Sequence, residues 1–296
     1  MAYVDLNVRA TAKVSANELQ RLGYATVCVN VDCDNDQKPK QASTLPDLQQ
    51  AGQREKTGKA AKKAKLYTPA LGNGVQLKDA NGGDKKELPR QRKRITLKLE
   101  DVIAAQRLVR SLKSEDLVVL VSSLRWVSIV LFQLSSDVVK GYDVVAAEAA
   151  SAKVFQFLCE QGDLDLITFD VTNRLPFPIK RPWIAAAIKR SIYFEITYTP
   201  CLGDTAGRRY FFLNASNLVR LTGGKNLVFS SGATRDILLR SPYDVVNIGL
   251  LSGLKYGQAL DAISTSCQAV LEHADRRRGV IGGVQVEANE DVVMKE

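Results

Sequence analysis

Short apolar runs alternate with amphipathic stretches from the start of the chain. Residues 3–8 (YVDLNV) are the first apolar run and are expected to form a strand. A helix should follow, because Ser15 is a suitable N-cap, Glu18 has the spacing of a capping box and Gly23 suits a helix end. Residues 25–29 are expected to be the next strand. The N-terminal part therefore predicts one β-α-β unit.

The same alternation resumes at Arg94 and runs to Arg277. Short runs rich in β-branched and aromatic residues predict strands, and amphipathic stretches predict helices. The expected strands are residues 95–99, 117–121, 142–145, 164–169, 192–197 and 226–230. The expected helices are residues 100–112, 126–139, 152–160, 183–190, 209–221 and 243–277, the last broken at Gly253 and near Ser264. Residues 174–182 contain three prolines and are expected to be a loop.

Strands that alternate with helices along a whole chain are typical of parallel sheets with crossover helices. The number of such units favours a closed or nearly closed α/β barrel over an open doubly wound sheet. No G-x-G-x-x-G follows the first strand and no G-x-x-x-x-G-K-[ST] occurs, so dinucleotide and P-loop sites lose their main support. We expect one domain over residues 1–278 and a flexible tail over residues 279–296.

One segment interrupts the pattern. Residues 32–89 are rich in Lys, Gln, Gly, Asn and Asp and have few large apolar residues, so they cannot bury enough surface to offset the entropy of ordering. We expect a disordered insertion in a βα loop. Its two basic clusters, residues 54–65 and 85–94, are compatible with nucleic-acid contact and equally with a plain solvated linker.

Charge and composition narrow the partner and the compartment. Lys and Arg outnumber Asp and Glu by 41 to 32 in the 296 residues, a formal net charge of +9 that favours an anionic partner. No apolar run reaches membrane-spanning length, and the N-terminus lacks the pattern of a secretory signal. The five cysteines are scattered and odd in number, which fits free thiols in a reducing compartment. We therefore expect a protein of the cytoplasm or nucleus.

The chain offers little for hydrolytic chemistry. Its one histidine, His273, cannot build a multi-histidine metal site, and no G-x-S-x-G supplies a nucleophile elbow. The carboxylates Asp5, Asp170 and Glu195 fall on expected strands or at their ends, where barrel enzymes place their reactive groups. A magnesium site of these carboxylates alone, serving a phosphoesterase, stays open as the alternative function. The main expectation is a protein with no metal and no other cofactor.

Six segments of the C-terminal half form an ordered set. They are residues 175–182 (LPFPIKRP), 194–200 (FEITYTP), 208–212 (RRYFF), 225–233 (KNLVFSSGA), 241–254 (SPYDVVNIGLLSGL) and 262–273 (AISTSCQAVLEH). In this order they closely resemble the thirty-kilodalton protein subunit family of nuclear ribonuclease P and RNase MRP, which also occurs in archaea. The resemblance covers residues 174–277 well, and the first strand also looks like that of the family.

The resemblance implies a TIM-barrel-like fold related to the polymerase and histidinol phosphatase superfamily. Active members of that superfamily carry a His-x-His metal motif on the first strand, where this chain has Asp5, Leu6 and Asn7. The resemblance therefore implies a protein that is not an enzyme by itself. It would be a component of an endoribonuclease ribonucleoprotein whose RNA carries out the phosphodiester chemistry of tRNA 5′-leader removal.

The family also implies partners and a location. The implied partners are the ribonuclease P and MRP RNAs, precursor tRNA and other protein subunits, including a small ferredoxin-like subunit. The implied location is the nucleus, and within it the nucleolus, where rRNA is also processed. Ser241 departs from the family, which usually has glycine before Pro242, and a side chain there is expected to alter the backbone angles of the turn.

Phosphate binding requires cations on a stable platform, and arginine suits bidentate contact with phosphate. Clusters of cations occur in loops that flank expected strands, although any one pair is equally compatible with ordinary surface charge. The RNA-binding candidates are Lys180, Arg181, Arg208, Arg209, Arg235, Arg240, Arg276 and Arg277. Tyr210 and Phe211 are candidates for stacking on an unpaired base, with a place in the core as the default.

Overall fold

Eight parallel strands form one sheet in the order β7-β6-β5-β4-β3-β2-β1-β8. The computed structural model describes residues 2–33, 41–42, 47–48, 88–99, 139, 141–203, 205–281 and 284–285. The strands are β1 (Tyr3–Lys13), β2 (Tyr24–Cys33), β3 (Arg90–Leu99), β4 (Val144–Ala149), β5 (Leu166–Thr168), β6 (Tyr193–Thr197), β7 (Leu227–Ser230) and β8 (Ala233–Arg235). Each pairs in parallel with its neighbour, as crossover connections require.

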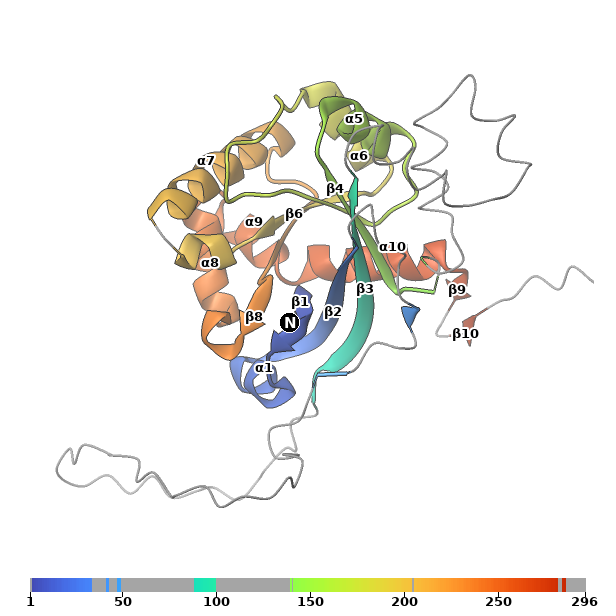
Figure 1. Ribbon diagram of the computed structural model, residues 1–296, viewed down its shortest axis with the longest axis vertical. Coiled ribbons are helices and arrows are strands. Elements are labelled where there is room, and N and C mark those ends of the chain that lie inside the picture. Colours follow the sequence, from blue (N-terminus) through green and yellow to red (C-terminus); the bar gives the residue numbers. More distant parts are fainter. Residues whose placement is uncertain are drawn as a thin grey trace, which may run out of the picture.

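The described helices pack around part of the sheet, and α10 (Thr265–Arg277) lies across one end of it (Figure 1). The other helices are α1 (Ala16–Leu22), α5 (Ala152–Glu160), α6 (Arg181–Lys189), α7 (Thr205–Thr222), α8 (Pro242–Leu251) and α9 (Tyr256–Asp261). Short 3-10 helices span η3 (Thr199–Leu202) and η4 (Asp236–Leu238), and β9 (Val280–Ile281) pairs antiparallel with β10 (Val284–Gln285). No helix in the described part of the chain is long and apolar enough to cross a membrane.

The sheet closes on itself through a two-residue step between β7 and β8. β7 pairs with β6 on one side, and β8 pairs with β1. Within the step, the amide of Gly232 donates to the carbonyl of Asn7 at 2.8 Å, and the hydroxyl of Ser231 donates to the same carbonyl at 3.0 Å. These bonds bring the last edge of the sheet to the first. The expectation of a parallel, TIM-barrel-like fold is confirmed.

Apolar side chains fill the amino half of the barrel interior. They come from β1, β2, β4, β5 and β7 and are Val4, Leu6, Cys28, Val144, Ala146, Leu166 and Val228. Helix α10 covers this end with Cys267, Val270 and Ala274. Cys28 and Cys267 are therefore core residues, and burial raises the pKa of both thiols.

A fully buried ion pair lies in the barrel interior. Arg94 on β3 and Glu195 on β6 both have 0% exposed side chains, and two hydrogen bonds of 2.5 Å join the guanidinium to the carboxylate. The guanidinium also donates to the carbonyl of Leu6 on β1 at 2.8 Å. Burial alone would raise the pKa of Glu195, but the charge and hydrogen bonds of Arg94 hold it below the usual carboxyl value.

The local predictions for the N-terminal unit hold with one correction. Ser15 is the N-cap of α1, and its hydroxyl accepts from the amide of Asn17 at 3.3 Å. The capping box is wrong, because the Glu18 carboxylate binds the Arg21 guanidinium and the Ser15 amide donates to Asp236 at 2.8 Å. A carboxylate from η4 thus takes the role expected of Glu18.

Other boundaries differ for identifiable reasons. Helix α5 matches its predicted range, and the last stretch breaks into three helices near Gly253 and Ser264 as expected. Helix α6 begins inside the predicted loop, because proline is well tolerated in the first turn. Ser241 has extended angles (φ −64°, ψ 151°), and its hydroxyl accepts from the amide of Asp244 as the N-cap of α8. The expected change of the turn relative to the family stays a prediction.

Several predicted elements lie mostly outside the residues that the structure describes. The helices at 100–112 and 126–139 lie almost entirely outside the described residues, as do the strand at 117–121, most of the insertion at 32–89 and most of the tail. The end of the second basic cluster is described, and residues 90–94 belong to β3. Placing Arg94 with that cluster was wrong, because its side chain faces the barrel interior.

Replacing Gly232 with alanine should loosen the closure of the barrel. Gly232 has φ +61°, and an added Cβ would overlap the Cγ2 atom of Thr197. We expect a loss of about 2–3 kcal/mol in the free energy of unfolding, measured by urea denaturation. The control is Gly257→Ala in α9, where a Cβ meets nothing and helix propensity favours alanine. Equal stability of the two variants would contradict this account of the closure.

Removing one partner of the buried ion pair should cost far more than removing both. Glu195→Gln leaves the Arg94 charge buried without compensation, and we expect a loss of about 3–5 kcal/mol in the free energy of unfolding. The double variant Arg94→Met/Glu195→Leu should regain most of that loss. Glu18→Gln removes the exposed pair with Arg21 and serves as the control, with little change expected. If the double variant lost as much stability as Arg94→Met and Glu195→Leu lose together as single variants, the two residues would not be coupled.

Stability should also fall on acidification in a way that depends on this pair. The folded-state pKa of Glu195 is depressed, so its contribution is complete above the unfolded carboxyl pKa and is lost as pH falls through the folded value. Urea midpoints measured from pH 7 down to about pH 3 should decline more steeply for the wild type than for the Arg94→Met/Glu195→Leu variant. Parallel curves would show that Glu195 does not contribute this term.

Candidate functional site

All strands of a parallel barrel end at one edge, here called the carboxyl edge, and this is where barrel proteins place their reactive groups. A cavity of about 250 Å³ opens there between β1–β6. Its lining is mainly polar and includes Asn7, Arg9, Asn30, Asp32, Thr96, Lys98, Glu148, Thr168, Asp170 and Thr197. Both signs of charge occur in it, so the cavity has no strong preference for an anion or a cation.

A ladder of neutral side chains connects the strands below this cavity. The Asn30 amide donates to the side-chain oxygen of Asn7 at 3.0 Å, and the Thr96 hydroxyl donates to the Asn30 side-chain oxygen at 2.8 Å. The Asn30 amide also reaches Asp32 at 3.1 Å, and Asp32 forms an ion pair with Arg9. Asn7, at the position where the resemblance places a metal histidine, is thus a member of a strand-to-strand hydrogen-bond ladder.

The three candidate carboxylates have separate structural partners. Glu195 is bound by Arg94 in the interior. Asp5 accepts from the amides of Asn7 at 3.0 Å and Ser231 at 3.1 Å, and burial raises its pKa. Asp170 is exposed and accepts from the amide of Thr172 at 2.9 Å, within its own turn. Each carboxylate therefore holds a strand or a turn in place.

The described residues contain no group of three His, Cys, Asp or Glu side chains that could hold a metal ion. Asp5 joins β1 to the closing step, Glu195 is neutralised by a guanidinium and Asp170 faces solvent. A carboxylate-only magnesium site needs several free carboxylate oxygens around one point. The geometry of these three residues does not support the alternative of a carboxylate-metal phosphoesterase.

The single histidine lies at the opposite edge of the barrel. His273 Nδ1 is 2.8 Å from the carboxylate of Asp165, which directly precedes β5. The same buried carboxylate binds Arg277 at 3.0 Å and accepts from the amide of Val145 at 2.8 Å. His273 and Arg277 therefore attach α10 to the amino ends of β4 and β5. His273 and Arg277 are therefore remote from the cavity at the carboxyl edge.

The RNA-binding candidates divide between the two edges. Five of them, Lys180, Arg181, Arg208, Arg209 and Arg240, follow β5, β6 or β8 in the chain, and Arg235 is the last residue of β8, so all six come at or after the carboxyl end of a strand. Arg276 and Arg277 belong to the end of α10 at the other edge. Arg276 is exposed, and Arg277 is largely taken up by Asp165. The topology thus brings six of the eight candidates to one edge.

Backbone and aromatic contacts orient several of the six. The Lys180 ammonium lies 5.0 Å from the ring centre of Trp183, a cation-π distance. Arg208 donates to the carbonyl of Cys201 at 3.1 Å, and Arg240 donates to the carbonyls of Ile237 and Leu239, both at 2.8 Å. The others, Arg181, Arg209 and Arg235, have exposed side chains. These contacts leave the positive charges uncompensated, because carbonyls and rings carry no full negative charge.

The two stacking candidates differ in exposure. Phe211 is fully buried against Phe212 in the outer core, with ring centres 5.2 Å apart, so the core alternative holds for it. Tyr210 is 37% exposed at the start of α7, next to Arg208 and Arg209. Only Tyr210 of the pair therefore has a ring that an unpaired base could reach.

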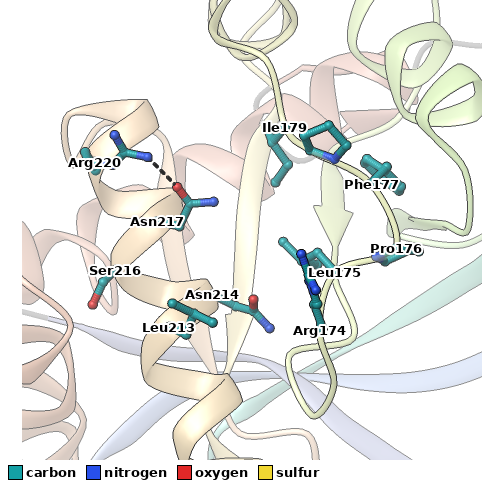
Figure 2. A pocket seen from close by; sticks show the side chains of 11 residues that line it. Arg174, Leu175, Pro176, Phe177, Ile179, Leu213, Asn214, Ser216, Asn217 and Arg220 are labelled. Carbon is teal, nitrogen blue, oxygen red and sulfur yellow. Dashed lines mark hydrogen bonds between the residues drawn. The ribbon is translucent and has the colours of Figure 1, made fainter.

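Sequence reasoning missed the interior position of Arg94 and a groove beside α7. The alternation of Arg94, Thr96 and Lys98 with Ile95, Leu97 and Leu99 was the signal that Arg94 shares a strand face with residues of the barrel interior. The groove has a volume of about 920 Å³ and lies between residues 174–179 and α7 (Figure 2). Its walls are far apart in the sequence, so no local pattern marks it.

Known proteins are similar to this chain in sequence and in fold. The family model described as RNase P subunit p30 matches residues 128–279. The chain is 41% identical over 152 residues to "Ribonuclease P protein subunit p30" of Mus musculus, covering 51% of this chain and 57% of the relative. It is 29% identical over 139 residues to "Ribonuclease P/MRP protein subunit RPP1" of Saccharomyces cerevisiae, covering 47% of each chain. The chain thus spans about half the length of these relatives.

A solved structure shares the fold over nearly the whole chain. It is a chain of the cryo-EM structure of archaeal ribonuclease P with mature tRNA, with a TM-score of 0.54 and 14% identity, covering 97% of this chain and 99% of that one. The family model matches 152 of the 296 residues of this chain, just over half of the sequence. By this match and the barrel, the chain belongs to the RNase P subunit p30 family.

Proposed function

We propose that this chain is a non-catalytic protein subunit of ribonuclease P, and of RNase MRP, that supports tRNA 5′-leader removal and rRNA processing. Family membership and the names of the mouse and yeast relatives support this assignment. Within such a particle the RNA would carry out the chemistry. The protein would bind and orient the catalytic RNA and precursor tRNA.

One observation carries the non-catalytic part of the proposal. The barrel interior that could present reactive groups to the carboxyl edge is instead occupied by the Arg94–Glu195 pair and the amide ladder of Asn7, Asn30 and Thr96. Every one of these groups is bound to a neighbouring strand. A general base needs a free lone pair directed at the substrate. The carboxylate oxygens of Glu195 instead accept hydrogen bonds from Arg94.

The outer surface of the carboxyl edge has the properties that RNA contact requires. Folded RNA is recognised largely by shape, through phosphates and 2′-hydroxyls. Lys180 and Arg181 stand at the start of α6, and Arg208 and Arg209 lie in the first turns of α7. The positive dipole end of each helix favours a phosphate at the same place. The neighbouring prolines also limit loop motion, which lowers the entropic cost of holding a cation against a phosphate.

The proposal extends to partners and location. We propose contacts with other protein subunits of the particle, including a small ferredoxin-like subunit, and a location in the nucleus and its nucleolus. The eukaryotic relatives named as ribonuclease P subunits support the nuclear part. Pull-down of the tagged protein followed by sequencing of its RNA tests the whole assignment, because ribonuclease P and MRP RNAs should be the enriched species.

Removing the cations at the starts of α6 and α7 should weaken RNA binding. The change is Lys180→Ala/Arg181→Ala/Arg208→Ala/Arg209→Ala, assembled with the cognate RNA and partner proteins. Every cation that neutralises a phosphate in the wild type should add about one to the slope of log affinity against log salt, so we expect this slope to decrease by up to about four. Filter binding at several salt concentrations measures it, with precursor-tRNA processing as the second readout.

The control replaces four exposed cations elsewhere on the described surface, Arg21, Lys189, Lys225 and Lys255, with alanine. A third variant deletes residues 54–65 of the basic insertion and should lose less affinity than the quadruple variant. If that deletion abolishes assembly while the quadruple variant behaves as wild type, the insertion is the RNA-binding element and the assignment to the barrel is wrong.

A further inference from the structure

The groove beside α7 combines an apolar floor with positively charged rims. Residues 174–179 form one wall and α7 the other, and Figure 2 shows Asn214 and Asn217 of α7 on the side of the helix that faces Leu175 and Ile179 of the loop. The apolar lining residues are Leu175, Pro176, Phe177, Pro178, Ile179 and Leu213. Leu213 is 61% exposed, so its side chain is accessible to a partner. The volume of about 920 Å³ is large enough for several side chains of a bound peptide.

Charge in the two walls has a single sign. Residues 171–190 and 205–225 contain nine Lys and Arg residues and not one Asp or Glu. Arg174 lines the groove from the loop and Arg220 from the helix (Figure 2). Asn217 accepts from Arg220 at 2.9 Å and so orients the guanidinium without neutralising it. A ligand with carboxylates would therefore meet two cations, of which Arg220 is already oriented.

The lining favours a protein segment over RNA. Single-stranded RNA binds apolar surfaces mainly by stacking its bases on exposed aromatic rings. Among the described residues that line the groove the aromatic one is Phe177, which is 8% exposed and packs against Phe155 with ring centres 5.4 Å apart. The surfaces offered to a ligand are aliphatic, as in grooves that bind the apolar face of an amphipathic helix.

We propose that this groove is the docking site for an acidic, amphipathic segment of a partner protein. Aliphatic side chains of that segment would pack between Leu213 and the Leu175–Ile179 wall, and flanking carboxylates would bind Arg174 and Arg220. Prolines 176 and 178 hold the loop wall in shape, so little conformational entropy is lost on binding. This interaction goes beyond the proposed contact with RNA and does not depend on it.

Peptide binding to the full chain tests the proposal directly. The probes are two fluorescein-labelled peptides of about 18 residues with leucine on one helical face and glutamate or lysine on the other, and a single-stranded oligouridylate. Fluorescence anisotropy should show that the glutamate peptide binds and that the lysine peptide and the oligouridylate do not. Arg174→Glu/Arg220→Glu should raise the Kd of the glutamate peptide by about tenfold or more, and Leu213→Asp, at an exposed position, should do the same.

The matched control is Lys153→Glu/Lys255→Glu, which makes the same change in net charge at exposed positions outside the groove. It should change the Kd by less than about twofold. Equal effects of the two double variants, equal affinity for the lysine peptide or no binding of the glutamate peptide would each overturn the proposal. Binding of oligouridylate that the groove variants abolish would make the site one for nucleic acid instead.

Crosslinking in the assembled particle identifies the natural occupant. A photoreactive benzoylphenylalanine introduced at Leu213 should crosslink to a protein segment rich in Asp or Glu, whereas the same group at Leu251, which is 71% exposed on α8, should not capture that segment. A crosslink from position 213 to RNA, to a second copy of this chain or to this chain itself would contradict the proposal, as would the absence of any crosslink. RNA assembly measured in the same sample separates this outcome from a failure of the proposed function.

Discussion

The guanidinium of Arg94 and the carboxylate of Glu195 face one another inside the barrel, and neither has any exposed surface. Two charges in such a place are costly unless each satisfies the other. Their two hydrogen bonds and the bond to the Leu6 carbonyl satisfy both charged groups except for the Arg94 Nε atom, which has no partner among the described residues. The same bonds connect β3 to β6 and to β1. The pair therefore fixes the relative position of strands on different sides of the barrel and fills its centre.

This interaction decides where function can reside. The centre of the barrel is occupied by a neutralised pair and by a ladder of amides and a hydroxyl, whereas the cations at the starts of α6 and α7 are exposed on the outside. The starts of α6 and α7 carry four cations, and the outer walls of these elements lack acidic residues altogether. The barrel thus acts as a rigid support whose charged edge and apolar groove are available to larger partners.

Much of this architecture follows from sequence pattern. The alternation of apolar runs predicted the parallel barrel, and Ser15, Gly253 and the range of α5 were recognised from local signals. Local signals failed where a distant residue decides. Asp236 occupies the Ser15 amide in place of Glu18, and β8 exists only because β1 is beside it. Arg94 was grouped with neighbouring basic residues, since only its partner Glu195, a hundred residues away, makes an interior arginine possible.

The same reasoning applies to the site. The six cations of the carboxyl edge could be predicted from loops that flank strands. That Arg277 lies apart from them could not, because it depends on the contact with Asp165 at the other edge.

The most direct test of the account measures the rate of precursor-tRNA cleavage by the assembled particle carrying Arg94→Met/Glu195→Leu. If the pair is structural, single-turnover cleavage of precursor tRNA should proceed at the wild-type rate once assembly is matched. A large loss of the cleavage rate with RNA and precursor binding intact would contradict the account and place catalysis in the barrel.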